Sequence, residues 1–360
     1  MAKTLGFGLL GAGLVAPFHA KSIRASKGGQ LVAVCDMNQE RAGKLAQEYG
    51  CRAYATLDEM LRDPQIHVVN VLTPNHLHCE AVLKCAQAGR HVITEKPPAM
   101  SLKDTDAMIA ACAQRGLKFG CTVQCRVRKA IQAIKQALAS GRFGKLLHAD
   151  AYMKWFRSTE YYFSDPWRSS RQSGAGVTIQ HAFHYLDLLQ YLAGSVARVE
   201  AKMTNLSHPS VQLEDTVLAF LRFRNGAQGV FEASTALWPG TDIRIEINGA
   251  DGTAIVTGEK MTTWKFRDER PEDEAIRQLG SAAQATAAGG AADFGFADHA
   301  VVIQDMIDAI NANREVIIPV SSVRPTLEAA LAMYHSAARG APVDLPIQDD
   351  PAVWSAPLRQ

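Results

Sequence analysis

The sequence has no apolar segment long enough to cross a membrane and no block of like charge. A membrane-spanning helix needs roughly 20 apolar residues, and the N-terminal segment enters a strand-like pattern without the apolar core of a signal peptide. Lys and Arg number 38 against 36 Asp and Glu, so the formal charge of +2 gives no electrostatic argument for binding nucleic acid or a membrane surface. We therefore expect a cytoplasmic protein that binds a small molecule, with neither nucleic acid nor a membrane as partner.

Cysteine is absent beyond residue 125, and none of the 7 cysteines forms a Cys-x-x-Cys pair. Such pairs are typical of zinc sites and of thiol redox centres. An odd number of cysteines without that spacing favours reduced and mostly buried thiols. We predict no metal site and no disulfide framework.

The chain of 360 residues is long enough for two domains. In the first part, short β-branched runs alternate with helical patterns, which predicts right-handed βαβ units and a doubly wound parallel sheet at residues 1–123. The expected strands are 5–10, 31–35, 67–72, 91–94 and 118–123, and the expected helices end near 26 or span 39–49, 76–88 and 102–115.

The pattern changes after residue 125 to longer runs with alternating or continuous apolar character, and Asn225-Gly226 between two of them is a strong hairpin signal. We expect an α+β domain at 124–360 with a large, mainly antiparallel open sheet. A sheet with one uncovered face predicts a homodimer or homotetramer built through it. The Ala- and Gly-rich stretch 281–292 is expected to be a flexible loop. The expected strands are 147–155, 197–203, 216–223, 229–236, 243–247 and 253–256, and the expected helices are 129–140, 299–311 and 325–338.

A glycine-rich turn joins the strand at 5–10 to the helix after it and matches the pattern G-x-G-x-x-G/A. Gly11 allows a tight turn, Gly13 lets the backbone approach a pyrophosphate, and the small Ala16 allows close packing of helix on strand. The start of the helix then offers amide donors to the phosphates. The residues assigned to this part of a dinucleotide site are Gly11, Gly13, Leu14, Val15 and Ala16.

Asp36 ends the second expected strand, where an acidic side chain accepts hydrogen bonds from the adenosine ribose. Met37 and Asn38 follow it, so the arginine that usually binds a 2′-phosphate is missing and NAD is favoured over NADP. The alternative is a glycine-rich turn in another α/β fold, which the coincidence of strand, glycines, helix and acid disfavours.

Two further segments follow strands of the parallel sheet, at the edge where ligands bind in such folds. Thr73, Pro74, Asn75 and His76 form the first, and Glu95-Lys96-Pro97 forms the second. We expect both to line the cofactor, with Lys96 near the nicotinamide. The alternative for Lys96 is an ordinary solvated surface lysine, although the prolines beside it restrict the backbone.

These motifs, above all Glu95-Lys96-Pro97, closely resemble the Gfo/Idh/MocA oxidoreductases, the family of glucose-fructose oxidoreductase and inositol dehydrogenase. The resemblance spans essentially the whole chain. It implies that Lys96 lies at the active site and that Pro97 is commonly preceded by a cis peptide bond. Later segments also follow the family's order, namely Trp167-Arg168, the Gly174-Ala175-Gly176 turn, His184, Asp187 and the helix with His299. We assign Gln124, Trp167 and Arg168 to the cofactor site as well.

The segment after Gly176 is predicted to be a helix that brings Gln180, His184 and Asp187 near one face. Many family members carry Asp-x-x-x-His here, with the histidine as acid or base and the aspartate assisting. Gln180 stands where that aspartate would be, which removes a charge that could raise the pKa of the histidine. His184 could instead be a satisfied core histidine. A metal site at His181, His184 and Asp187 lacks the spacing of known motifs.

The resemblance implies an oxidoreductase that transfers a hydride between NAD(H) and a hydroxyl-bearing carbon of a sugar, cyclitol or nucleotide sugar. His184 would remove the hydroxyl proton and Lys96 would hydrogen-bond the same oxygen, and which of them is the formal base stays open. The alternatives are an NAD-dependent glycosidase and a non-catalytic NAD-sensing protein. Several cationic and aromatic residues suit a polyhydroxylated or anionic substrate, namely Arg126, Arg128, Lys154, Arg157, Tyr161, Tyr162, Trp167 and Arg168.

Overall fold

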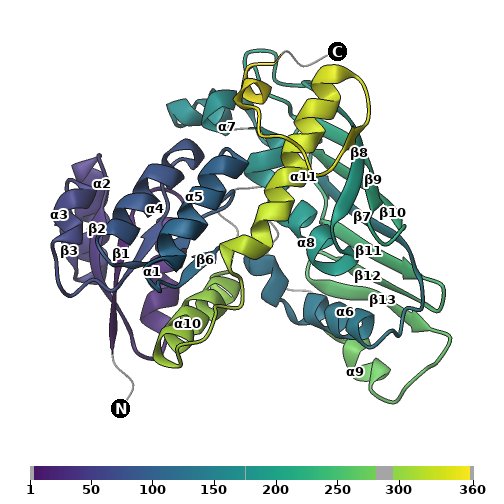
Figure 1. The fold of residues 1–360 in the computed structure, drawn as a ribbon, viewed down its shortest axis with the longest axis horizontal. Helices are drawn as coiled ribbons and strands as arrows, with labels where there is room; N and C mark the ends of the chain where they lie inside the picture. Colours follow the sequence, from purple (N-terminus) through teal and green to yellow (C-terminus); the bar gives the residue numbers. More distant parts are fainter. Residues whose placement is uncertain (1–3, 175, 281–294, 357–360) are drawn as a thin grey trace. The chain divides into compact units, whose positions relative to one another are not determined.

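A computed structural model describes residues 4–174, 176–280 and 295–356 of the chain (Figure 1). The chain divides into two compact units. Unit 1 comprises Met1–Gln124 and Gly295–Arg324, and unit 2 comprises Cys125–Phe294 and Pro325–Gln360. The predicted flexible loop at 281–292 and the middle residue of the Gly174-Ala175-Gly176 turn lie outside the described residues.

Unit 1 contains a six-stranded sheet with the order β3-β2-β1-β4-β5-β6, and every strand pair in it is parallel. This confirms the doubly wound sheet. The order reverses at β1 and β4, and ligands in such sheets bind beyond the carboxyl ends of the strands at that point. The strands are β1 (Leu5–Leu10), β2 (Gly29–Cys35), β3 (Arg52–Tyr54), β4 (Val68–Val71), β5 (His91–Thr94) and β6 (Phe119–Cys121).

The helices of unit 1 alternate with these strands, as the sequence predicted. Leu5, Phe7 and Leu9 of β1 pack with Ala20 and Ile23 of α1 in one apolar core, which fixes the helix after the glycine turn against the sheet. The helices are α1 (Ala16–Ala25), α2 (Gln39–Tyr49), α3 (Leu57–Leu61), η1 (Asn75–Leu77, a 3₁₀ turn), α4 (His78–Gln87), α5 (Leu102–Ala113) and α10 (Ala297–Asn311).

The division of the chain differs from the predicted single C-terminal domain at 124–360, because residues 295–324 return to unit 1. The reason is apolar packing: Ile303, Met306 and Ile307 of α10 belong to the same core as β1 and α1. The main chain adds a hydrogen bond from Cys121 N–H to Ile318 O at 3.1 Å. α11 (Val320–Arg339) follows and continues from Pro325 in unit 2.

Unit 2 contains an eight-stranded sheet with the order β13-β12-β11-β7-β10-β9-β8-β14. Its pairs are antiparallel except β10 with β7, and the Asn225-Gly226 turn joins β9 to β10 as predicted. This confirms a mainly antiparallel sheet. Its strands are β7 (Leu146–Lys154), β8 (Val196–Thr204), β9 (Thr216–Phe223), β10 (Gln228–Ser234), β11 (Arg244–Gly249), β12 (Gly252–Thr257), β13 (Lys260–Phe266) and β14 (Val343–Asp344).

One face of this sheet is packed and the other is open. Burial alternates residue by residue along β9, and Leu218 and Phe220 on its outer side are 51% and 69% exposed. Helices of unit 2 lie against the packed face (Figure 1). The other helices and short turns outside unit 1 are η2 (Gln124–Val127, which begins at the last residue of unit 1), α6 (Lys129–Ala139), α7 (Thr159–Phe163), η3 (Pro166–Ser169), η4 (Arg171–Ser173), η5 (Val177–His181), α8 (Phe183–Ala193), α9 (Asp273–Arg277) and η6 (Pro351–Trp354).

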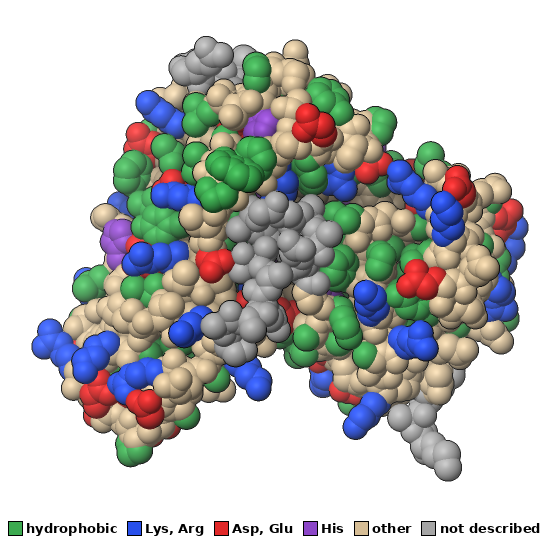
Figure 2. Space-filling view, turned by 180° about the vertical axis from the view of Figure 1, so that it is seen from behind, with side chains coloured by type: hydrophobic (Ala, Val, Ile, Leu, Met, Phe, Trp, Pro, Cys, Tyr) green, Lys and Arg blue, Asp and Glu red, His purple; other side chains and the backbone are tan. Residues whose placement is uncertain are grey.

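Basic and acidic side chains are interspersed over the face drawn in Figure 2, as the nearly balanced composition suggests. Among the described residues, no helix is both long and apolar enough to span a bilayer.

Candidate active site

The glycine turn after β1 has the geometry that dinucleotide binding requires. Gly11 has a φ of 109°, and a Cβ added to it would lie 2.7 Å from the carbonyl oxygen of Leu72. Its N–H donates to Cys35 O at 2.7 Å, which draws the turn against the end of β2. A Cβ at Gly13 would meet no atom within 4 Å. The backbone at Gly13 therefore faces open space, as the predicted approach of a pyrophosphate needs.

Asp36 lies directly beside this turn. One carboxylate oxygen accepts a hydrogen bond from Ala12 N–H at 2.7 Å, and the other accepts one from Asn38 N–H at 2.8 Å. These bonds fix the carboxylate at the end of β2, where the ribose of a dinucleotide lies in such folds. Met37 beside it is 90% exposed. The residues of this edge thus fit NAD.

The loops after β4 and β5 are joined by a buried histidine. His78, at the start of α4, places Nδ1 2.8 Å from Pro97 O and Nε2 2.9 Å from Thr73 O. Burial lowers the pKa of His78, against the two carbonyl contacts, which raise it. The structure therefore brings the predicted Thr73–His76 and Glu95–Pro97 segments together, with the Lys96–Pro97 peptide bond in the cis form. Within the first segment Asn75 is buried and His76 is exposed.

Glu95 is held in a polar cluster that sequence reasoning did not find. His19 Nε2 of α1 lies 3.0 Å from Glu95 Oε1, and His19 Nδ1 lies 2.9 Å from Asn70 Nδ2 on β4. His299 of α10 packs edge-on against His19, with ring centroids 5.3 Å apart. Burial raises the pKa of Glu95, but the hydrogen bond and charge of His19, with the charges of His299 and Lys96, outweigh it and hold that pKa at about 2.

The donor atoms of His19, Glu95 and His299 all lie within 4.8 Å of one another, and imidazole and carboxylate are donors that zinc accepts. One of these contacts is the hydrogen bond between His19 Nε2 and Glu95 Oε1 at 3.0 Å. The predicted absence of a metal site thus stays a prediction. The cluster itself gave no local sequence signal, since Glu95 is 76 residues from His19.

In unit 2 the segment with Gln180 begins as a π-helix, η5 (Val177–His181), instead of the α-helix that the sequence predicted. Ala182 N–H donates to Val177 O at 2.8 Å, five residues back. Gly176 has a φ of 122°, and a Cβ there would lie 2.4 Å from Glu214 Oε1. Such π turns are rare and are frequent at functional sites.

Gln180 and His184 are partly exposed, whereas Asp187 on α8 is fully buried. Arg126 donates from Nε and Nη2 to the two carboxylate oxygens of Asp187, each at 2.6 Å, and Thr326 Oγ1 adds a bond at 2.8 Å. That Gln180, His184 and Asp187 lie near one face stays a prediction. The Asp187 carboxylate is paired with Arg126.

The cationic and aromatic residues predicted to face a substrate fall into two groups. Several have partners within unit 2: Arg128 pairs with Glu259 at 3.0 Å, Lys154 pairs with Glu232 at 3.2 Å, and the buried Tyr162 hydroxyl lies 2.7 Å from Thr235 Oγ1. The other group surrounds Tyr161, whose ring lies 5.7 Å from the Arg157 guanidinium and 4.9 Å from that of Arg168.

Arg168 belongs to the short turn η3 and also lies over the ring of Trp167 at 4.8 Å. Its Nη1 donates to the Tyr161 hydroxyl at 2.8 Å. Arg157 is 4% exposed, and burial lowers its pKa. Two buried guanidinium groups thus lie beside one aromatic ring, and that of Arg168 is also paired with Asp165 at 3.5 Å.

Comparison with known proteins adds to this geometry. Residues 5–123 match the family described as "Oxidoreductase family, NAD-binding Rossmann fold", and residues 131–255 match the "GFO/IDH/MocA C-terminal domain". The 1,5-anhydro-D-fructose reductase of Ensifer adhaerens is 30% identical over 267 residues, which cover 72% of this chain and 77% of that protein. The myo-inositol 2-dehydrogenase of Thermotoga maritima is 27% identical over 268 residues, covering 73% and 78%.

Among solved structures, the WlbA dehydrogenase from Bordetella pertussis, in complex with NADH and UDP-GlcNAcA, superimposes with a TM-score of 0.85. It is 29% identical in sequence, and the match covers 96% of this chain and 100% of that one. The two family matches and this structure describe the same pair of domains.

Proposed function

The chain belongs to the Gfo/Idh/MocA family of oxidoreductases, and from this membership we propose that it transfers a hydride between NAD(H) and a hydroxyl-bearing carbon of a sugar, cyclitol or nucleotide sugar. The observation that carries the proposal is in unit 1. The open backbone at Gly13, the fixed carboxylate of Asp36 and the Glu95-Lys96-Pro97 segment all follow the carboxyl ends of strands in one parallel sheet.

The residues of the chain have distinct roles in this proposal. NAD, when bound, supplies the carbon that accepts or donates the hydride. Lys96 hydrogen-bonds the oxygen of the reacting hydroxyl and stabilises its developing negative charge. His184, oriented by Gln180, exchanges the hydroxyl proton. Gln124, Trp167 and Arg168 complete the set of residues that hold the cofactor.

The substrate class follows from relatives and from charge. The relatives named above act on, or are bound to, cyclic polyols, sugars or a nucleotide sugar. The positive charges of Arg157 and Arg168 beside Tyr161 support a substrate with an acidic group among these. A screen should therefore include uronic acids and nucleotide sugars as well as neutral cyclitols.

We also propose a cytoplasmic enzyme that forms a homodimer or homotetramer through the open face of the unit 2 sheet. The 7 cysteines are free thiols, which suits a reducing compartment. Leu218 and Phe220 provide exposed apolar surface on that face.

The experiment that tests the proposed reaction is a screen of sugars, cyclitols and nucleotide sugars with NAD⁺, in which net formation of NADH is recorded. Net NADH supports a dehydrogenase. Cleavage of a glycoside without net NADH would favour the NAD-dependent glycosidase, and binding of NAD without any turnover would favour the NAD-sensing protein.

Lys96→Ala then tests the central residue. Because the lysine touches the reacting oxygen and not the pyrophosphate, turnover should fall by roughly 10² to 10⁴ while NADH affinity stays nearly unchanged. Lys84→Ala, a half-exposed lysine of α4 paired with Glu80, is the matched control and should keep wild-type turnover. Normal turnover of Lys96→Ala on an identified substrate would remove Lys96 from the mechanism.

A further inference from the structure

The backbone on both sides of Lys96 is held by buried histidines. On the N-terminal side, Glu95 Oε2 accepts a hydrogen bond from Lys96 N–H at 3.3 Å, and Oε1 of the same carboxylate lies 3.0 Å from His19 Nε2. On the C-terminal side, Pro97 O lies 2.8 Å from His78 Nδ1. The carboxylate of Glu95 therefore links His19 directly to the main chain of Lys96.

His19 has a second polar partner, the Asn70 amide, at its other ring nitrogen. The Asn70 amide lies 2.9 Å from Nδ1, and when that amide donates, Nδ1 is the acceptor and Nε2 carries the hydrogen. Nε2 then donates to Oε1 of the Glu95 carboxylate at 3.0 Å. His19 and Asn70 are 1% and 0% exposed, so both bonds are shielded from water.

The position of His19 gives these bonds a second consequence. His19 lies in α1, the helix that begins at Ala16 directly after the glycine turn. The helix that receives the pyrophosphate and the segment that carries Lys96 are thus joined by one buried hydrogen bond. His299 from α10 packs against the His19 ring, and its charge also lowers the pKa of Glu95.

From this arrangement we propose that His19 is a positioning residue: through Glu95 it holds Lys96 in register with the cofactor-binding helix. The inference rests on the proposed function of Lys96. Loss of the bond would leave the fold and the glycine turn in place but let the main chain of Lys96 shift, and a misplacement of about 1 Å can cost about 10²-fold in rate.

The test compares His19→Asn with His19→Gln in the full-length protein. The amide of Gln reaches the place of Nε2 and can donate to Glu95, whereas the amide of Asn reaches only the place of Nδ1. We expect His19→Asn to lower kcat, calculated per competent NADH-binding site, by roughly 10- to 100-fold. His19→Gln should keep a kcat within about 5-fold of the wild-type value. NADH titration by fluorescence counts the competent sites, so a smaller folded fraction does not mimic the effect.

A double-mutant cycle with Lys96→Ala separates positioning from packing. If His19 acts through Lys96, then His19→Asn should cost less than about 3-fold when Lys96 is already absent. His91→Asn is the control. His91 is the first residue of β5, the strand that leads into Glu95, and its Nδ1 accepts a hydrogen bond from Lys118 N–H at 2.9 Å. We expect His91→Asn to keep wild-type kcat.

The outcomes are distinct. An equal loss with and without Lys96, equal losses for His19→Asn and His19→Gln, or an unchanged kcat for His19→Asn would each overturn the positioning role of His19. Normal turnover of Lys96→Ala alone would instead overturn the proposed function of Lys96.

Discussion

At the scale of single residues, we propose that Asp36 determines the preference for NAD over NADP. Its carboxylate is held by Ala12 N–H and Asn38 N–H and would face the 2′-phosphate of NADP. We expect NADP to bind one to two decades more weakly than NAD, equivalent to about 1 to 3 kcal/mol. Fluorescence titration of both reduced cofactors measures this ratio.

Asp36→Asn is the matched variant, since an amide keeps an oxygen for one of the two backbone bonds but loses the charge. The ratio of the affinities of Asp36→Asn for NADH and NADPH should approach one. Equal affinities of the wild-type protein for the two cofactors would show that Asp36 does not discriminate against the 2′-phosphate.

Gln180 and His184 are the pair where this sequence departs from the Asp-x-x-x-His pattern of the relatives it resembles. The next acidic residue of this segment, Asp187, is paired with Arg126. Replacing Gln180 by Asp should then raise the apparent pKa of the acidic limb of the pH–rate profile by up to about a unit. His184→Ala should abolish that limb and most of the rate.

Gln180→Asn is the uncharged control and should leave the apparent pKa of the acidic limb unchanged. The profiles need an identified substrate and conditions in which chemistry limits turnover. If Gln180→Asp left the limb unmoved and His184→Ala kept an unchanged profile, Lys96 would become the candidate for the base.

The site residues that could be predicted are those with a local pattern. Gly11, Gly13 and Asp36 follow from the strand, turn and helix around them, and Lys96 follows from its place after a strand. The partners of Glu95 and Asp187 could not be predicted, because His19 and Arg126 lie 76 and 61 residues away from them. Only the three-dimensional packing of separate elements creates those contacts.

At the scale of elements, strand and helix positions in unit 1 could be predicted because each has its own apolar period. Three strands were missed for physical reasons. β3 has three residues, two of them exposed, β13 alternates around Lys260, Thr262 and Lys265, and β14 has only two residues. The π-helix η5 could not be predicted either, since its first turn donates from Val177 N–H and Thr178 N–H to Glu214, which lies in a distant segment of the chain.

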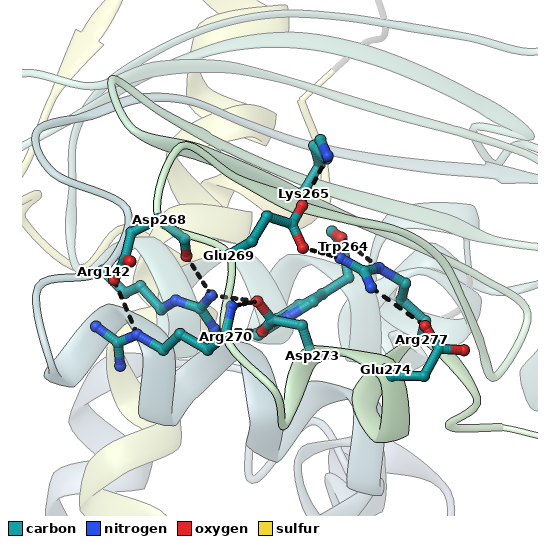
Figure 3. A network of polar contacts seen from close by, with 9 residues as sticks. All are labelled: Arg142, Trp264, Lys265, Asp268, Glu269, Arg270, Asp273, Glu274 and Arg277. Carbon is teal, nitrogen blue, oxygen red and sulfur yellow. Dashed lines mark hydrogen bonds and ion pairs between the residues drawn. The ribbon is translucent and has the colours of Figure 1, made fainter.

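The short helix α9 is held by a buried ion pair between Asp273 and Arg142 and by a hydrogen bond from Trp264 of β13, and the strength of the ion pair can be tested. Asp273 accepts bonds from the Arg142 guanidinium, from Trp264 Nε1 at 2.6 Å and from Arg270 N–H at 2.8 Å (Figure 3). These bonds, with Arg142 first, hold the pKa of Asp273 well below its usual range. Arg142→Ala leaves a buried charge unpaired and should cost about 3 to 5 kcal/mol in the free energy of unfolding.

The same ion pair predicts a pH dependence. Because the folded state depresses the pKa of Asp273, the stabilisation is complete above the unfolded pKa of about 4 and declines as the pH falls below it toward the folded value. Lys265→Ala is the control, since its bond to Glu269 at the outer side of this network is exposed and should matter by less than about 1 kcal/mol. Urea unfolding at several pH values measures both. Equal effects of the two substitutions, or an Arg142→Ala deficit that stays constant down to pH values well below the usual Asp range, would contradict this account.

At the scale of the whole molecule, residues 295–324 belong to unit 1 although they follow most of the unit 2 sequence. The sequence around 295–324 has the apolar periodicity of a helix. This periodicity does not show against which of the two cores the helix packs. The contacts of Ile303 and Met306 with the β1 core decide this. The open face of the unit 2 sheet, by contrast, follows from the alternation along its strands, and its surface leads to a prediction about assembly.

Phe220 is 69% exposed on β9, opposite Glu200 on β8 and Val230 on β10. In a two-fold symmetric dimer built through this face, both copies of Phe220 are buried. Complete burial of one such side chain stabilises the dimer by about 1.5 to 3 kcal/mol. Phe220→Glu should therefore shift the assembly toward the monomer, as measured by light scattering after size-exclusion chromatography at several protein concentrations. Phe163→Glu on α7 replaces a residue that is 57% exposed outside the sheet, and it should leave the mass unchanged. A wild-type monomer at all concentrations, or a Phe220→Glu protein with the wild-type oligomeric mass, would show that the open face does not carry the assembly.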